Sequence, residues 1–352
     1  MSASSVEHRH ERIVAVWLLV CCVMIFAMVV LGGVTRLTGS GLSMVEWDPI
    51  FGVVPPLNEQ EWQRVFEQYR ASPEYQKVNL HMEVDDFKSI YWFEFTHRLL
   101  GRAIGTVFLL PFLFFLWRGW LRRPLIPKLI AMFVLGGLQG ALGWYMVASG
   151  LVDNPHVSQY RLTAHLLMAF LIYGFIFWVA LDLLAGRNES ETTGSPNRLY
   201  SGTGWFLSLL VVTIGSGGLV AGLRAGYAYS TFPLMDGHLV PKALFLLEPR
   251  WRNFFENIAT VQFDHRLLAT LVFVSGIALW FHARRLPAPL RLRSHLLLLM
   301  IGVQVALGIS TLLLHVPIAL ASLHQAGALV LFTVTLYLLH GMRGKRQEAR
   351  DK

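Results

Sequence analysis

The sequence has few charged residues. Only 15% of its 352 residues are Asp, Glu, Lys or Arg, whereas 54% are hydrophobic. A soluble domain of this length would expose too much of that apolar surface to water, which excludes a water-soluble protein. The composition therefore predicts an integral membrane protein.

Cysteine is equally scarce, since Cys21 and Cys22 are the only two in the chain. They are adjacent in one apolar run, where neighbouring helical residues point to different faces. We therefore expect small packing residues and no disulfide. No cluster of cysteines or carboxylates accompanies the histidines, which disfavours a tetrahedral zinc site.

Long apolar runs dominate what is present. A run of about 20 apolar residues spans the hydrocarbon core of a bilayer, and the sequence contains eight. We therefore predict an all-α integral membrane protein with eight transmembrane helices. The expected spans are residues 14–35, 91–117, 126–148, 161–184, 203–223, 261–281, 294–315 and 319–340.

Basic residues gather in the connections after the second and sixth runs and at both ends of the chain. By the positive-inside rule these segments are cytoplasmic, and the net charge of +8 points to anionic lipid headgroups, not nucleic acid. The first eleven residues form neither a signal peptide nor an organelle presequence, which favours a bacterial cytoplasmic membrane. The basic residues are Arg9, Arg12, Arg118, Arg122, Arg123, Lys128, Arg284, Arg285, Arg291, Arg293, Arg343, Lys345, Arg346, Arg350 and Lys352.

Two hydrophilic segments organise the rest. Within the outside segment, apolar residues from Trp62 to Tyr69 are spaced by three and four, which predicts an amphipathic helix over 58–79. The cytoplasmic segment 186–202 begins with many Ser, Thr and Gly residues and is typical of a linker. It divides the chain into an N-terminal bundle, 1–185, and a C-terminal bundle, 203–352.

The two halves resemble each other. Residues 94–100 read Glu-Phe-Thr-His-Arg-Leu-Leu and residues 262–268 read Gln-Phe-Asp-His-Arg-Leu-Leu. Residues 139–143 read Gln-Gly-Ala-Leu-Gly and residues 304–308 read Gln-Val-Ala-Leu-Gly. Because each half contains an even number of spans, the copies share one orientation. We predict a parallel internal repeat of two pseudo-symmetric four-helix bundles.

Four histidines occupy matching places in this repeat, two in each half. We expect all four in the first turns of helices that begin on the outside face, and hence at one depth. Facing histidines in a four-helix bundle are a common way to hold haem iron. The alternative, hydrogen bonding between helices, is weaker for four residues placed by a repeat. The predicted iron ligands are His97, His165, His265 and His324.

Four arginines accompany the histidines. Arg98 and Arg266 directly follow a histidine, and Arg36 and Arg224 end the first span of each half. Their guanidinium groups suit haem propionates. The alternative is that they extend to lipid phosphates.

The halves differ at Glu94, whose counterpart is the neutral Gln262. A carboxylate one turn from His97 can accept a proton or orient a water molecule, which an amide cannot do. Alternatively, Glu94 only partners an imidazole or Arg98. We therefore predict chemistry in the N-terminal half, with Glu94, His97 and His165 as the catalytic set, and a resident cofactor in the C-terminal half.

A motif in the first outside loop carries a family resemblance. Residues 32–44 read Gly-Gly-Val-Thr-Arg-Leu-Thr-Gly-Ser-Gly-Leu-Ser-Met, and Trp47, Pro49 and the Pro55–Pro56 pair follow. Together with residues 94–98, they resemble the haem A synthase family over nearly the whole chain. The resemblance implies an oxidoreductase that converts the C8 methyl group of haem O to a formyl group, giving haem A for cytochrome c oxidase.

The resemblance also implies where the haems bind. Substrate haem O is expected between His97 and His165, with Glu94 required nearby, and haem b between His265 and His324. The implied partners are an electron donor or acceptor of unknown identity, haem O synthase, oxidase assembly factors and a second copy of the chain.

One departure from the family pattern and three alternative functions bear on the predicted haem A synthase activity. Many bacterial members carry a cysteine pair in an outside loop, and residues 36–90 and 149–160 contain none. No mechanism that needs those cysteines applies. A di-haem electron-transfer cytochrome would use the same four histidines, but would place its haems at opposite depths. A transporter would show paired Gly/Pro breaks, and a haem O synthase needs Asp-rich motifs that are absent.

Overall fold

Eight helices long and apolar enough to cross a membrane dominate the structure, a computed structural model that describes residues 3–47, 52–152, 155–185 and 197–343. Within these ranges no strand forms, and the predicted all-α membrane protein is confirmed. The spans are α1 (Ala3–Leu37), α4 (Val84–Trp117), α5 (Ile126–Gly150), α6 (Gln159–Ala185), α7 (Asn197–Gly222), α9 (Ile258–Ala283), α10 (Ala288–Leu313) and α11 (Ile318–Gly341).

Several helices begin earlier than the apolar runs predicted. Helix α4 begins at Val84 because Glu83 and Asp86 form a capping box, in which each side chain accepts a hydrogen bond from the other residue's backbone N–H. Helix α7 begins at Asn197, inside the predicted linker 186–202. The rest of that linker, Pro49 and the basic tail after Arg343 lie outside the described residues.

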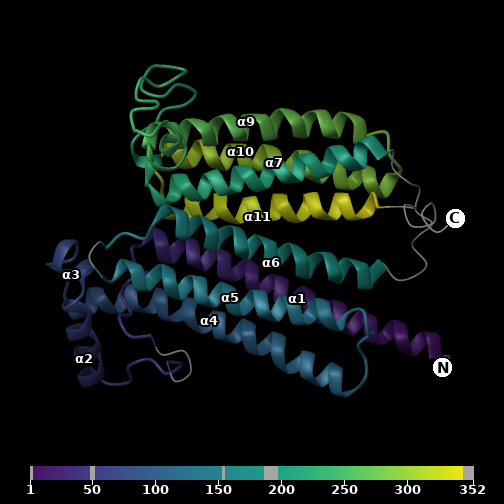
Figure 1. Ribbon diagram of the computed structural model, residues 1–352, viewed down its shortest axis with the longest axis horizontal. Helices are drawn as coiled ribbons and strands as arrows, with labels where there is room; N and C mark the ends of the chain where they lie inside the picture. The colour runs from purple at the N-terminus through teal and green to yellow at the C-terminus, as the bar shows by residue number, and fades with distance from the viewer. Residues whose placement is uncertain (1–2, 48–51, 153–154, 186–196, 344–352) are drawn as a thin grey trace.

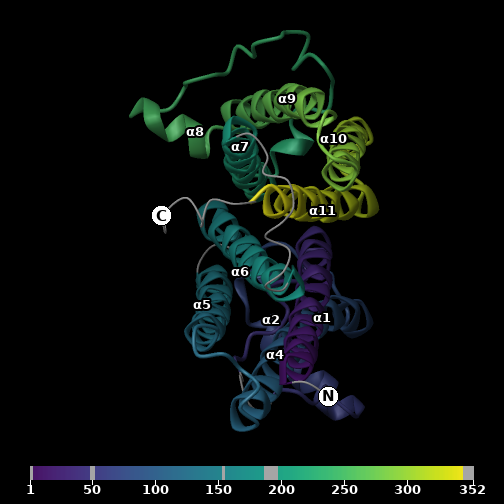
Figure 2. The same cartoon turned by 90° about the vertical axis from the view of Figure 1, so that its right-hand side faces the viewer.

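The spans lie in two groups (Figures 1 and 2). Helices α1, α4, α5 and α6 contact one another around a ring, and α7, α9, α10 and α11 form a second ring. Contacts between α1 and α11 and between α6 and α7 join the groups. This arrangement supports the division into two bundles, which, like the internal repeat, stays a prediction.

Two features confirm close packing in the first group and between the groups. Cys21 and Cys22 are buried and form no disulfide, as predicted. Between the groups, Thr333 on α11 donates a hydrogen bond to the Tyr173 hydroxyl on α6 across 2.9 Å.

The predicted amphipathic helix over 58–79 is two helices, α2 (Glu59–Arg70) and α3 (Pro73–Lys77). The chain breaks because Pro73 has no N–H to continue α2. Ser72 then caps α3 by accepting a hydrogen bond from the backbone of Tyr75 at 3.3 Å.

These two helices form a cap on α4 at the end that we expect to lie outside the membrane, and we call it the outside cap. The predicted apolar face is confirmed, since Trp62, Phe66 and Tyr69 are buried. The Trp62 and Tyr91 ring centroids lie 5.0 Å apart, as do those of Tyr69 and Phe87. Aromatic packing therefore fixes the cap to the first turns of α4.

A second segment at the end that we expect outside the membrane joins α7 to α9. It contains the short helices η2 (Ala225–Tyr227), η3 (Arg250–Arg252) and α8 (Asn253–Glu256). Figure 1 shows it at the same end of the molecule as α2 and α3, opposite the end where α1 begins and α11 finishes. This agrees with an even number of spans, and the assignment of that face to the outside stays a prediction.

Candidate functional site

Each of the four predicted histidines lies against a glycine of a neighbouring helix. A Cβ built on these glycines would lie 2.9–3.2 Å from an atom of the imidazole ring, closer than side chains normally pack. Glycine therefore leaves the space that each ring occupies. The pairs are His97 with Gly32, His165 with Gly143, His265 with Gly217 and His324 with Gly308.

The expected position in the first turns holds for three histidines and is wrong for His97. His165, His265 and His324 lie within about two turns of the start of their helices. His97 lies almost four turns after Val84, because α4 extends outward to carry the cap.

The repeated Gln-x-Ala-Leu-Gly motif positions two of the histidines. Gln139 on α5 donates to the backbone carbonyl of His165 at 3.0 Å, and Gln304 on α10 donates to that of His324 at 2.9 Å. The buried Nδ1 atoms of both histidines have no hydrogen-bond partner among the described residues. An unsatisfied buried nitrogen is costly, so each ring is expected to meet a further group.

His265 is held more firmly than His97. Ser216 donates its hydroxyl hydrogen to the Thr213 carbonyl at 2.8 Å, so its oxygen accepts from Nδ1–H of His265, also at 2.8 Å. This leaves Nε2 of His265 with a lone pair for a metal. No hydrogen bond to His97 occurs in the described part of the chain, and Leu31 stands before its glycine where Ser216 stands before Gly217.

Glu94 is buried and fully engaged. Its Oε2 accepts from the Ser43 hydroxyl and from the backbone N–H of Met44, both at 2.8 Å, and its Oε1 pairs with Arg98 at 2.6 Å. Arg98 also donates to the carbonyl oxygens of Met44 at 2.9 Å and Glu46 at 3.0 Å. The contacts match the alternative in which Glu94 partners Arg98, and they fasten the first outside loop to α4.

The second half fastens its outside loop without a carboxylate. Gln262 donates to the Tyr229 carbonyl at 2.9 Å, and Arg266 donates to the same oxygen at 3.1 Å. Gln262 therefore takes the structural place of Glu94 without its charge.

Arg36 and Arg224 differ from the other two predicted arginines. They lie near one another at the ends of α1 and α7, and neither guanidinium group forms a hydrogen bond or a salt bridge with another described residue. Two neighbouring cations that form no salt bridge among the described residues favour binding of a negatively charged group.

The outside cap contains a carboxyl group that the sequence analysis missed. Glu74 is buried, and Tyr69 donates a hydrogen bond to it at 3.2 Å. Burial raises the pKa of Glu74 to about 7. The sequence offered one signal for this burial: Glu74 directly follows Ser72 and Pro73, a pair that is typical of a turn.

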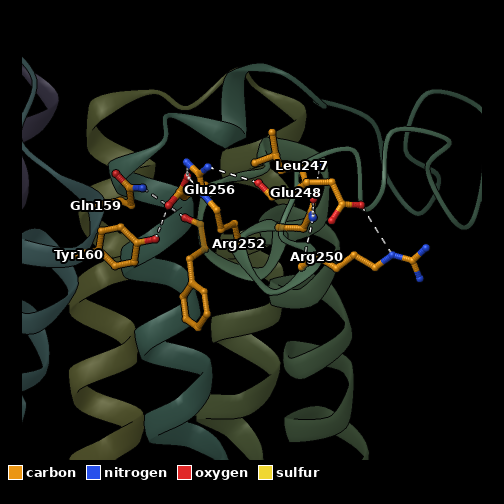
Figure 3. A network of polar contacts seen from close by, with 9 residues as sticks. Gln159, Tyr160, Leu247, Glu248, Arg250, Arg252 and Glu256 are labelled. Atoms are coloured by element: carbon orange, nitrogen blue, oxygen red, sulfur yellow. Dashed lines mark hydrogen bonds and ion pairs between the residues drawn. The ribbon is translucent and has the colours of Figure 1, made fainter.

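A polar network joins the two halves at the outside end (Figure 3). Tyr160 at the start of α6 donates to Glu256 of α8 at 2.9 Å, and Gln159 donates to the Phe255 carbonyl at 3.4 Å. Hydrogen bonds from Arg252 and Tyr160 hold the pKa of Glu256 below its usual value. A pocket of about 780 Å³, lined by residues 228–231 and 256–259 among others, opens beside this network.

The donor set of each bundle fits haem better than a protein-bound metal ion. A tetrahedral zinc site requires at least three His, Cys, Asp or Glu side chains close together. In the ranges that the structure describes, no such cluster occurs. Two histidines suffice for haem, because the porphyrin supplies four nitrogens. The glycine-backed imidazoles and unpaired nitrogens therefore fit axial ligands.

Comparison with known proteins gives concordant matches. The family model described as cytochrome oxidase assembly protein matches residues 15–336. A protein of Nitrosospira multiformis named heme A synthase is 57% identical over 95% of this chain and 94% of its own. Proteins with the same name from Nitrosomonas eutropha and Paramagnetospirillum magneticum are 54% and 50% identical, and cover 92% and 97% of both chains.

Proposed function

Because the chain belongs to the cytochrome oxidase assembly protein family, we propose that it is a haem A synthase. It oxidises the C8 methyl group of haem O to a formyl group, and the product serves cytochrome c oxidase. With the oxygen of one water molecule, this conversion releases four electrons and four protons. A partner that accepts or supplies electrons is therefore required.

The observation that carries the proposal is the pair of glycine-backed histidines in each bundle. His97 and His165 would hold haem O, and His265 and His324 would hold a resident haem b. The hydrogen bond from His265 to Ser216 supports this allocation, because a ligand with a fixed ring suits a permanent cofactor. His97 lacks such a restraint, which suits a substrate that must leave.

The residues around the histidines orient the substrate. Glu94 and Arg98 hold the first outside loop against α4, and we assign Glu94 a positioning role through that loop. Arg36 and Arg224 are the best candidates for haem propionates, because their donors are not engaged by the protein. When bound, haem supplies the redox chemistry.

The setting of this reaction is proposed on the same grounds. The spans place the chain in a membrane, and the basic connections favour the bacterial cytoplasmic membrane with both termini inside and the haem sites near the periplasm. Haem O synthase, oxidase assembly factors and a second copy of the chain are the partners to test.

Haem analysis tests the proposal. Haems are extracted from cells that make haem O, with and without this protein, and separated by chromatography. Haem A should appear only when the protein is present. Bound haem b with no haem A, in the presence of a competent electron partner, would favour a di-haem electron-transfer cytochrome.

A further inference from the structure

One polar side chain crosses between the two bundles beside both histidine pairs. Gln325 directly follows His324 on α11, and its Nε2 donates to the backbone carbonyl of Val29 on α1 at 2.6 Å. In an α-helix that carbonyl already accepts from the N–H of Gly33, four residues later. Gln325 therefore adds a second hydrogen bond to a backbone group of the opposite bundle.

Gly33 makes this contact possible. A Cβ at Gly33 would lie 2.8 Å from Oε1 and 3.0 Å from Nε2 of Gln325, too close for the amide to keep its place. The preceding glycine, Gly32, lies against His97. The same turn of α1 thus contacts His97 of its own bundle and Gln325, which directly follows His324, of the other bundle.

The clamp has no equivalent on the opposite side of the interface. In the predicted repeat, the residue that matches Gln325 on α6 is Leu166. There the bundles meet through Thr163, whose Oγ1 would lie 2.8 Å from a Cβ at Gly218 and has no partner among the described residues. At the level of the histidines, α11 is therefore hydrogen-bonded to α1, whereas Thr163 of α6 only packs against Gly218 of α7.

We propose that Gln325 is a positioning residue that fixes the separation and orientation of the two haem sites by clamping α11 to α1 at Gly33. The inference rests on the proposed function, in which each bundle would hold a haem, and it adds that electrons would pass between the two sites. In each exchange one haem iron would lose the single electron that the other gains, so no further reactant would be needed. Its rate depends on how rigidly the two bundles are held at this level.

The test uses purified protein that carries haem b and has been loaded with haem O. Two variants remove the clamp in different ways: Gln325→Leu deletes the donor, and Gly33→Ala displaces the amide. Tyr173→Phe is the matched control, because it removes the hydrogen bond between Thr333 and Tyr173. That bond also joins the two bundles, through α11 and α6, but it lies more than two turns from His324 along α11.

Both clamp variants should keep the haem b content of the unmodified protein. They should weaken the magnetic interaction between the two ferric haems and slow electron equilibration after photoreduction several-fold, whereas Tyr173→Phe should do neither. Unchanged coupling in both clamp variants, or an equal loss in the control, would overturn the positioning role. A second haem that cannot be loaded into the unmodified protein would instead overturn the proposed function.

Discussion

The two groups of spans carry matching sequence motifs but hold their outside loops and histidines differently. In the N-terminal bundle, a buried ion pair between Glu94 and Arg98 fastens the loop. In the C-terminal bundle, the amide of Gln262 takes that place, while Ser216 restrains His265. An ion-paired loop contact beside an unrestrained histidine suits an exchangeable substrate, and a contact without a carboxylate beside a restrained histidine suits a resident cofactor.

The largest effect on this comparison is expected from Glu94→Gln, which makes the first bundle resemble the second. The amide keeps the shape but loses the ion pair with Arg98, so haem A output should fall by about 10- to 100-fold while haem b content stays unchanged. Haem extraction from cells making haem O measures both. The control is Glu67→Gln, which changes an exposed carboxylate in the same way. Normal haem A output from Glu94→Gln would show that Glu94 has no role in the reaction.

Gly308→Ala should damage the resident site next most strongly. The new methyl group would lie 2.9 Å from Cε1 of His324, and overpacking of this kind costs about 1–3 kcal/mol. Haem b retained through purification should therefore decrease. Gly302→Ala, on the same helix with no atom within 4 Å of its Cβ, should retain haem b. Equal retention in both would show that Gly308 does not shape the site.

Ser216→Ala should have a smaller effect, on the electronic properties of the cofactor. Loss of the hydrogen bond to Nδ1 of His265 makes the imidazole a weaker donor, which should raise the reduction potential of haem b. A spectroelectrochemical titration measures this shift, with Ser275→Ala on α9, whose hydroxyl donates to backbone carbonyls of its own helix and not to His265, as the control. An unchanged potential would mean that Ser216 does not tune this ligand.

The smallest effect on haem chemistry is expected in the outside cap. The pKa of Glu74 is raised to about 7, so the folded cap binds a proton more tightly than the unfolded chain. Its contribution is fully present below the ordinary carboxyl pKa and is lost as the pH rises through about 7.

Hydrogen exchange of the α2 and α3 amides should accordingly be faster at about pH 8 than at about pH 5, after correction for the intrinsic rate. Glu74→Gln should abolish this dependence, whereas Glu67→Gln should keep it. A dependence that persists in Glu74→Gln would assign it to another group.

The sequence predicted the spans because an apolar run has a fixed length requirement, and it predicted the histidines because they repeat. It did not predict the break at Ser72 and Pro73, since the apolar spacing continues on both sides. The glycines behind the histidines were also missed. Gly32 and Gly217 are separated by many residues from the rings that they contact, and only helix packing brings each pair together.

The contacts of Glu94 required the structure for a similar reason. Its charge and its spacing from His97 pointed toward acid–base chemistry. Its partners Ser43 and Met44 lie on a loop about 50 residues earlier, and no periodic pattern connects a loop to a helix face.

A comparison of His97→Ala with His265→Ala tests the division of labour most directly. Both proteins are purified for haem b content, and the cells that produce them are analysed for haem A. The His265→Ala protein should lose haem b, whereas the His97→Ala protein should keep haem b and yield no haem A. Full haem b in the His265→Ala protein, or its loss only in the His97→Ala protein, would contradict the assignment of the two bundles.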